Sequence, residues 1–278
     1  MKVSERGTAR WLKLCVAYTG TLIVSLFVFI IVYAVIGLVK TEGALFTSVW
    51  HPEGESFGLL PMIRATFMLA VSSLAAGTFL SLGCIAYMHG GGNRCIASVL
   101  RTVIRLMTAV PTVVYGFASV FILVPFIRDM LGGSGYSWLT ATLVLGLLIT
   151  PAMVISMDKA VEELKSETAL TCFALGFTPE QTFAYVILPA SRRWLSASVI
   201  LGFGRAVGDT LIPTMLAGNA PQFVNHPLQA MRTLTAHIGL VLSADIGGTA
   251  YYSLFVAGGI LLAASVLFNL IVLWIRGR

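Results

Sequence analysis

The sequence predicts an all-α polytopic membrane protein with six transmembrane helices and both termini in the cytoplasm. Of its 278 residues, 57% are hydrophobic and only 11% are charged, whereas about a quarter of the residues in an ordinary soluble domain are charged. The charged residues fall in clusters. The apolar runs between them are long enough for helices of about 20 residues, which cross ~30 Å of hydrocarbon.

Five long runs carry no charge, and a sixth carries only two charged residues. Lys and Arg cluster at alternate ends of these runs, and this positive-inside pattern places both termini in the cytoplasm. The first run has no convincing signal-peptide cleavage site before Lys40, so we expect a retained helix. The expected transmembrane helices cover about 14–39, 61–88, 98–126, 138–157, 194–218 and 249–275.

Prolines and glycines mark starts, kinks and connections of these predicted helices. Pro61 begins the second helix, where its missing N–H does no harm. Pro111 is expected to kink the third helix. The Gly-rich stretch RDMLGGSGYSW forms an outer loop before the fourth helix, and an outer connection with Pro221 and Pro227 leads to the sixth.

The residue types exclude several classes of function. The His and Cys residues share no metal-ligand spacing, and no nucleophile and acid-base set converges, so we expect no metal, cofactor or catalytic residue. The alternating distribution of the basic residues argues against a nucleic-acid partner. Because the chain lacks a GxxxxGK[ST] phosphate-binding loop, ATP hydrolysis would need a separate subunit.

Residues 158–193 form one long charged cytoplasmic segment that predicts two short helices. Gly176 stands where a helix C-terminal glycine is expected. The second helix should begin with Thr178 as N-cap, Pro179 at the first helical position and Gln181 closing a capping box. We expect Pro189 to end it.

Such a segment favours a docked protein partner. The alternative is an interfacial segment lying on lipid headgroups. Four basic residues are outnumbered by five carboxylates, which makes an anionic membrane surface a poor partner. The carboxylates belong to Asp158, Glu162, Glu163, Glu167 and Glu180.

Three motifs carry a resemblance to a known family. The helix-turn-helix with Gly176 followed by Ile187-Leu188-Pro189 resembles the Glu-Ala-Ala loop of ABC importer permeases. AVPTVVYGFASVFILVPFIR (109–128) and GRAVGDTLIPTMLAGN (204–219) are similar to segments of phosphate-specific ABC permeases, and TMLAGN looks more like the C-type subunit. The motifs occur in the family's order, and the resemblance runs from about residue 60 to the end.

The resemblance implies one permease domain over 1–278, with 158–193 as its coupling segment, in the bacterial cytoplasmic (inner) membrane. It implies that Glu167, Gly176, Leu188 and Pro189 couple to an ATP-binding subunit, although Glu167 stands farther from Gly176 than the family's glutamate usually does. It also implies a second permease subunit, making a heterodimer, and an extracytoplasmic phosphate-binding protein.

Arg205 and Asp209 are two charges inside an apolar run. Arg205 is the twelfth residue from Trp194, so at ~1.5 Å per residue it would lie roughly 17 Å along the helix, near the bilayer centre. Asp209 would point from nearly the same face. Placing either charge there costs at least ~2.5 to 3.5 kcal/mol, so neither should face lipid.

Two interpretations remain for this pair. An intrahelical ion pair contributes only ~0.2 to 0.5 kcal/mol, too little to offset the insertion cost. The other interpretation is an anion path, with Asp209 holding the Arg205 guanidinium and the adjacent Thr210 on the same path. Gly204 and Gly208 form a GxxxG spacing that would let another helix approach closely.

The expected function is therefore the permease subunit of an ATP-driven importer of inorganic phosphate. Asp209 stands where the phosphate permeases usually have glutamate, so the alternative cargo is another oxyanion: molybdate, tungstate, sulfate or phosphonate. An ion-coupled secondary transporter, with Asp209 carrying a proton, is a further alternative. It has no need of an ATPase dock. A membrane-embedded enzyme would need a reactive set that the sequence lacks.

Overall fold

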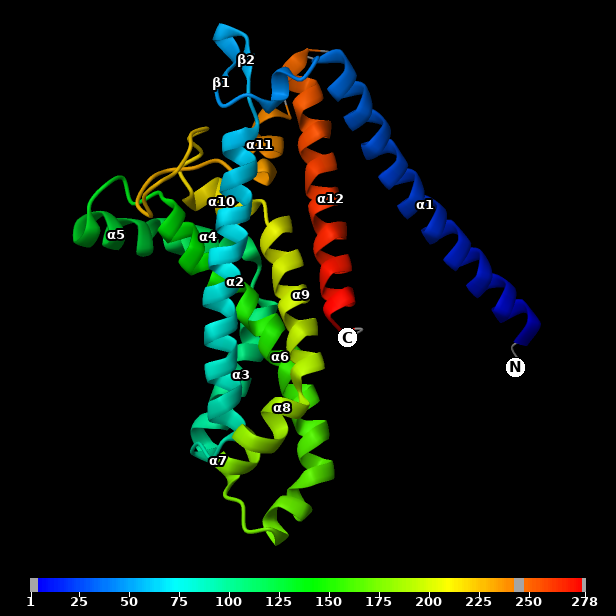
Figure 1. The fold of residues 1–278 in the computed structure, drawn as a ribbon, viewed down its shortest axis with the longest axis vertical. Coiled ribbons are helices and arrows are strands. Elements are labelled where there is room, and N and C mark those ends of the chain that lie inside the picture. The colour runs from blue at the N-terminus through cyan, green and yellow to red at the C-terminus, as the bar shows by residue number, and fades with distance from the viewer. Residues whose placement is uncertain (1–4, 243–247, 277–278) are drawn as a thin grey trace.

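The computed structural model describes residues 5–242 and 248–276, which form long helices roughly along one axis (Figure 1). The helices are α1 (Glu5–Lys40), α2 (Leu60–His89), α3 (Arg94–Ala109), α4 (Thr112–Phe121), α5 (Leu123–Leu131), α6 (Trp138–Ala174), α7 (Pro179–Gln181), α8 (Leu188–Ala190), α9 (Arg192–Gly208), α10 (Leu211–Leu216), α11 (Leu234–Val241) and α12 (Thr249–Arg276). Short helical turns η1 (Ala44–Phe46), η2 (Pro52–Gly54) and η3 (Thr182–Ile187) and a small hairpin of β1 (Trp50–His51) and β2 (Ser56–Phe57) complete the fold. The all-α class is confirmed, with this hairpin as an addition.

Five helical runs among the described residues are long and apolar enough to cross a membrane. They cover Trp11–Lys40, Leu60–His89, Thr112–Leu131, Trp138–Ala174 and Thr249–Ile271. The first, second and sixth predicted helices are confirmed as α1, α2 and α12. The fifth corresponds to α9, which has only 17 residues. The six-span count and the cytoplasmic location of both termini therefore stay predictions.

The third predicted helix, 98–126, is not continuous, and this expectation was wrong. Val110 and Pro111 adopt extended backbone between α3 and α4, because proline lacks an N–H and keeps the preceding residue out of the helical region. The Tyr115 hydroxyl donates to the Met107 carbonyl across this break at 2.9 Å. A second break at Ile122 starts α5, which projects sideways from the bundle (Figure 1).

The fourth predicted helix ends later than expected. We expected it to stop at 157 and a separate helix to follow, but α6 continues from Trp138 to Ala174 without interruption. The charges at Asp158 and Lys159 mark a change of surroundings and do not end a helix. The first helix of the coupling segment is thus a rigid extension of a membrane helix.

The core of the bundle lies where α6 packs against α2 and α9. Leu145, Ile149 and Met153 of α6 are completely buried there. A Cβ at Gly77 of α2 would lie only 2.7 Å from the Ile149 side chain, and one at Gly202 of α9 would lie 2.7 Å from the Met153 sulfur. These glycines therefore let three helices approach closely.

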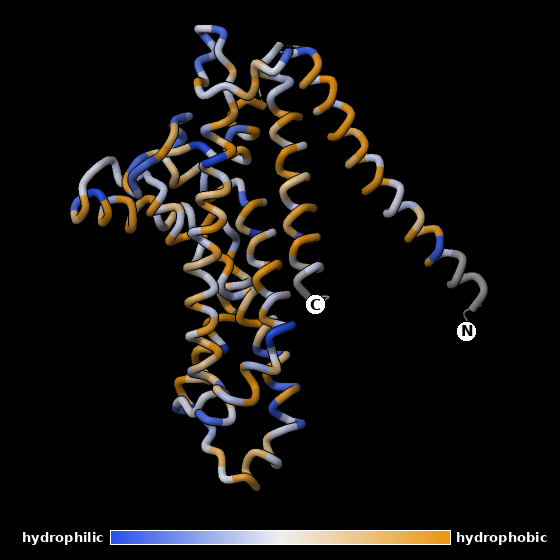
Figure 2. The backbone as a smooth tube through the Cα atoms, viewed as in Figure 1, coloured by the Kyte–Doolittle hydropathy of each residue, from blue (hydrophilic) through white to orange (hydrophobic). Residues whose placement is uncertain are grey.

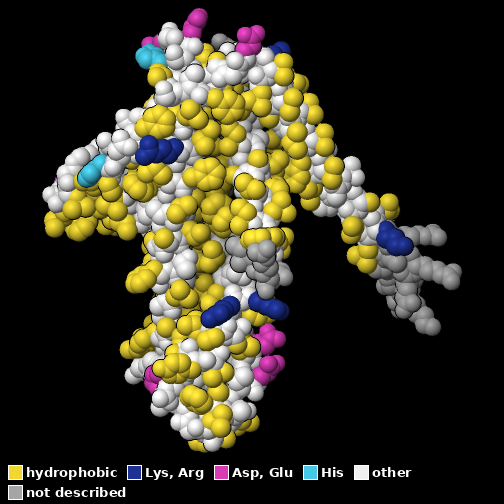
Figure 3. All heavy atoms as spheres, in the orientation of Figure 1, with side chains coloured by type: hydrophobic (Ala, Val, Ile, Leu, Met, Phe, Trp, Pro, Cys, Tyr) yellow, Lys and Arg dark blue, Asp and Glu magenta, His cyan; other side chains and the backbone are white. Residues whose placement is uncertain are grey.

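The first and last helices show a different environment. α1 meets α12 near the end that carries the hairpin and diverges from the bundle toward its own start (Figure 1). Both helices are predominantly hydrophobic along their length (Figure 2). Apolar side chains also cover much of the visible face, with a few charged groups among them (Figure 3). This surface is suited to lipid or to another membrane helix.

A second, smaller core lies at the hairpin end. It joins the hairpin and the start of α2 to α11 and α12. Its buried residues are Leu45, Trp50, Leu59, Met62, Leu234, Val256 and Ala257. The described residues at the hairpin end thus form an ordered unit that includes α11, a helix that was not predicted from the sequence.

Candidate transport path and coupling segment

The coupling segment begins with the helix stop that the sequence predicts at Gly176. Gly176 has φ of 78°, which favours glycine. Its N–H donates to the Phe173 carbonyl, and the Phe177 N–H donates to the Cys172 carbonyl, both at 3.0 Å. These two hydrogen bonds together form a Schellman motif, so the predicted end of the first helix is confirmed.

The predicted start of the second helix is also confirmed. The Gln181 N–H donates to the Thr178 hydroxyl at 3.2 Å, and the Thr178 N–H donates to the Gln181 side chain at 2.9 Å. Hydrogen bonds from its own backbone N–H and from Thr178 lower the pKa of Glu180 below its ordinary value. The capping box therefore orders the turn between the two helices.

We expected Pro189 to end the second helix, but it does not. α7, η3 and α8 form one helical run from Pro179 to Ala190, with Pro189 inside its last turn. Proline cannot supply the N–H of a regular helix, and the wider π-helical turns of η3 lie just before it. The run ends at Ser191, after which α9 begins. Leu188 and Pro189 line a cavity of about 410 Å³ facing Leu82 of α2.

The tip of the coupling segment is apolar and exposed. Leu170, Phe173, Leu175 and Tyr185 are 83, 81, 70 and 72% exposed. We call these four residues the apolar tip. The coupling segment that carries them lies at the lower end of the molecule (Figure 1), where apolar side chains are visible on the surface (Figure 3). Glu167 lies nearby on the exposed surface of α6, with no ion pair to a described residue.

The structure corrects the expected geometry of Arg205 and Asp209. A continuous helix over 194–218 was expected, but α9 ends at Gly208 and Asp209 is extended, with ψ of 126°. The Asp209 carboxylate accepts from the Ile212 N–H at 2.9 Å, at the start of α10. Within the described residues no ion pair joins Asp209 to Arg205, so the structure contains neither the intrahelical ion pair nor the expected contact by which Asp209 would hold the Arg205 guanidinium. Aspartate is a strong helix N-cap, which gives its carboxylate a nearer partner.

Arg205 and Thr210 lie on either side of this break. Arg205 is exposed in the last turn of α9 and has no carboxylate within 4.0 Å among the described residues. Thr210 lines a cavity of about 410 Å³ together with Gly208 and Thr235 of α11. Arg205 and Asp209 do not line it. The predicted path residues thus share one helix break without converging on one cavity.

Arg232 is a second cation near the break that the sequence reading missed. Its Nε donates to the Asn219 carbonyl at 2.9 Å, just beyond the end of α10. No carboxylate of a described residue lies within 4.0 Å of it. The available signal was that Arg232 is the sole charged residue between Asp209 and Asp245 in the sequence.

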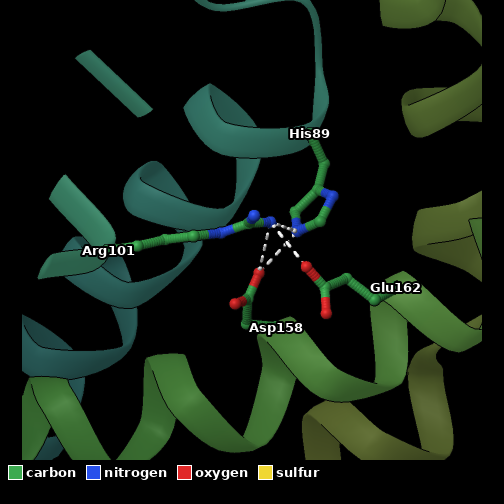
Figure 4. Close-up of polar contacts among 4 residues, drawn as sticks. All are labelled: His89, Arg101, Asp158 and Glu162. Atoms are coloured by element: carbon green, nitrogen blue, oxygen red, sulfur yellow. Dashed lines mark hydrogen bonds and ion pairs between the residues drawn. The ribbon is translucent and has the colours of Figure 1, made fainter. Parts of the chain in front are cut away.

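The sequence reading also missed an ion-pair cluster formed by His89, Arg101, Asp158 and Glu162 (Figure 4). His89, the last residue of α2, donates from Nε2 to Asp158 Oδ1 at 2.7 Å. Arg101 of α3 pairs through Nη2 with Asp158 at 3.1 Å and with Glu162 at 2.9 Å. The cluster therefore ties α2 and α3 to α6 where the coupling segment begins.

Comparison with known proteins gives the family and the fold. Residues 79–278 match the model of the family described as binding-protein-dependent transport system inner membrane component. The chain is 31% identical over 237 residues to the probable ABC transporter permease protein YqgH of Bacillus subtilis, which covers 82% of this chain and 75% of that protein. It is 23% identical over 233 residues to the phosphate transport system permease protein PstC of Mesorhizobium japonicum, which covers 77% of this chain and 71% of that protein.

A solved structure agrees with the fold. An inward-facing conformation of the MetNI methionine ABC transporter matches with a TM-score of 0.63 at 15% identity, over 78% of this chain and 94% of that one. The relatives named phosphate transport system permeases confirm the resemblance to that group at the level of sequence similarity. The chain belongs to the binding-protein-dependent transport system inner membrane component family and is a transmembrane permease subunit of an ABC importer.

Proposed function

We propose that this permease subunit imports inorganic phosphate across the bacterial cytoplasmic membrane, driven by ATP hydrolysis on a separate subunit. The observation that carries this proposal is the apolar tip. Its four large apolar side chains are exposed within residues 158–193, outside the predicted membrane region. An apolar patch of this kind marks a protein interaction site. The ATPase docks there, and Glu167, Gly176, Leu188 and Pro189 form the coupling contacts or support them.

The transport path passes the break between α9 and α10. Arg205 offers a planar guanidinium whose donors no carboxylate of a described residue occupies, and such a group suits an oxyanion. Asp209 orients α10 through the Ile212 N–H, and Thr210 supplies a hydroxyl beside the adjacent cavity. An unpaired arginine can bind and release the anion without first breaking an ion pair.

Two features support the proposed partners. α1 exposes apolar residues along its length, and a second permease subunit covers part of this surface and closes the path. The ordered unit at the hairpin end, opposite the apolar tip, receives an extracytoplasmic phosphate-binding protein. With α9 and α10 together completing a sixth span, both termini lie in the cytoplasm.

Phosphate is favoured as the cargo because several relatives, including that of M. japonicum, are named phosphate transport system permeases. Transport by the assembled importer in proteoliposomes tests this. ATP-dependent uptake of labelled phosphate should be competed by unlabelled phosphate and not by sulfate, molybdate, tungstate or phosphonate. If one of those anions competes more strongly than unlabelled phosphate does, that anion is the cargo. Uptake driven by a proton gradient with no ATPase present would contradict the ATP-driven mechanism.

Substitution at the apolar tip tests the docking contact. Phe173→Asp combined with Tyr185→Asp should prevent co-purification of the ATPase, because both exposed rings would lose apolar contact. Ser166→Asp is the matched control, since it adds a charge at an exposed position of the same helix outside the tip. Co-purification that survives the double substitution would overturn the docking assignment.

A further inference from the structure

The ion-pair cluster at the base of the coupling segment leaves its arginine incompletely satisfied. Both ion pairs of Arg101 use the same Nη2 atom, while its Nε is buried without an acceptor. His89 already donates from Nε2 to Asp158, so the approach of Nη2 to that same nitrogen at 3.4 Å provides no acceptor either. A buried donor without an acceptor, such as Arg101 Nε, is unusual. A movement of the Arg101 side chain that brings Nε to an acceptor would therefore improve its hydrogen bonding.

The two carboxylates offer alternative positions for that movement. Asp158 and Glu162 stand four residues apart on α6, so their side chains lie one above the other on the same face. The Asp158 side chain is only 15% exposed, whereas that of Glu162 is 54% exposed. Arg101 thus contacts a largely buried acceptor, Asp158, and a more exposed one, Glu162, from the same Nη2 atom (Figure 4).

Space for movement exists next to the cluster. A cavity of about 280 Å³ is lined by His89, by residues of α6 and by residues of the second helix of the coupling segment. Its lining includes Phe173, Phe177 and Thr182. The π-helical turns of η3 begin at Thr182, and such turns often lie at functional sites. The second helix can approach α6 by closing this cavity.

The turn between α2 and α3 lies in contact with that second helix. Gly91 has φ of 96°, and a Cβ at this position would collide with the Glu180 carboxylate of α7. A Cβ at Gly90 would lie 3.7 Å from the Phe183 ring of η3. The turn is thus held between the coupling segment on one side and, through His89 and Arg101, α6 on the other.

From α3, contacts continue toward the proposed path. The Tyr115 hydroxyl binds the Met107 carbonyl and connects α3 with α4. A Cβ at Gly116 of α4 would lie 2.6 Å from the Met215 sulfur of α10, so α4 and α10 touch closely. α10 is the helix whose start is capped by Asp209. These contacts form a continuous series from α3 to the helix break.

We propose that the ion-pair cluster transmits movement of the coupling segment to α3, with Arg101 as the positioning residue that stays paired to α6 while the second helix closes on the cavity. This inference rests on the proposed function, because an ATPase must supply the movement. Without a movement supplied by an ATPase, the cluster would only hold three helices together. The two roles differ in one measurable quantity, the number of anions imported per ATP hydrolysed.

Glu162→Gln tests the proposal at the most exposed member of the cluster. The variant should assemble with the ATPase and hydrolyse ATP at the wild-type rate, and phosphate uptake per ATP should fall at least about fivefold. Glu163→Gln is the matched control, because Glu163 is an adjacent exposed carboxylate without an ion pair to a described residue. Its ratio should stay at the wild-type value.

Substitutions at Arg101 sharpen the test. Arg101→Gln should lower the ratio as Glu162→Gln does, and Arg101→Lys, which keeps a charge able to pair, should restore most of it. An unchanged ratio in Glu162→Gln with the complex intact would overturn the role of the cluster and leave the proposed function standing. Failure of the wild-type chain to co-purify with any ATPase would overturn the proposed function itself.

Discussion

Two groups of charges in this permease differ in how they are built. Arg205 and Asp209 come from one short stretch, and they do not pair. His89 and Asp158 are 69 residues apart in the sequence and form the shortest hydrogen bond of the cluster, at 2.7 Å. In the first group a helix break separates the charges, whereas in the second three helices bring them together.

This difference separates two roles for charge in a membrane helix bundle. A paired group of carboxylates and cations fixes helices relative to one another, because removing one partner leaves another buried and unpaired. An unpaired arginine keeps its donors available for a passing anion. The cluster is therefore suited to transmitting movement, and the helix break to contacting the cargo.

The largest stability effect should come from the paired group. Asp158→Ala should lower the free energy of unfolding by about 2 to 3 kcal/mol, because it leaves the donor of the buried His89 and the Arg101 guanidinium without their shared acceptor. Denaturation in detergent micelles measures this. The neighbouring Lys159→Ala, which removes a cation outside the cluster, should change stability by less than about 0.5 kcal/mol. Equal effects would show that the cluster contributes no more than an ordinary surface charge.

A buried histidine outside both groups should give a somewhat smaller effect. Burial, together with the positive charge of Arg232, lowers the pKa of His237 to about 3. Below its unfolded-state pKa near 6.5 the unfolded chain binds a proton that the folded chain does not. Stability should therefore fall as pH falls, by about 1.4 kcal/mol per pH unit, or about 2 kcal/mol at pH 5.

Denaturation of the detergent-solubilised protein between pH 7 and pH 5 measures this slope. His237→Gln should flatten it, whereas His226→Gln in the exposed outer connection should leave it unchanged. A slope that persists in His237→Gln would assign the pH dependence to another group.

The smallest of these effects should come from the unpaired group. Asp209→Ala should cost about 1 kcal/mol, the usual value of an N-cap, because the Ile212 N–H loses its acceptor. Asp209→Asn keeps an acceptor oxygen and should be close to wild type in the same denaturation measurement. If Asn is as damaging as Ala, the negative charge itself matters, and Asp209 would interact with Arg205 after all.

Local signals in the sequence were sufficient for part of the fold. Gly176 and the Thr178–Gln181 box act through hydrogen bonds within a few residues, so their outcome can be read from residue types alone. The apolar runs of α1, α2 and α12 were equally readable, because membrane thickness sets their length.

The remaining features depend on interactions that spacing does not encode. The charges at Asp158 and Lys159 suggested a helix end, but α6 continues because neither residue interrupts its hydrogen bonds. Asp209 was read as a helix-face residue, although its position three residues before Ile212 also fits a cap, and the cap is what the structure contains. The ion-pair cluster required knowing which helices touch, and no single stretch contains that information.

The most direct test of the account is phosphate uptake by Arg205→Ala in proteoliposomes that contain the complete importer. Losing one charged contact to the anion should lower uptake at least about tenfold, with assembly and protein stability near wild type because Arg205 is exposed and forms no ion pair with a described residue. Arg193→Ala, which removes an exposed arginine at the other end of α9, should retain uptake. Uptake by Arg205→Ala equal to that of Arg193→Ala would contradict the assignment of the helix break to the anion path.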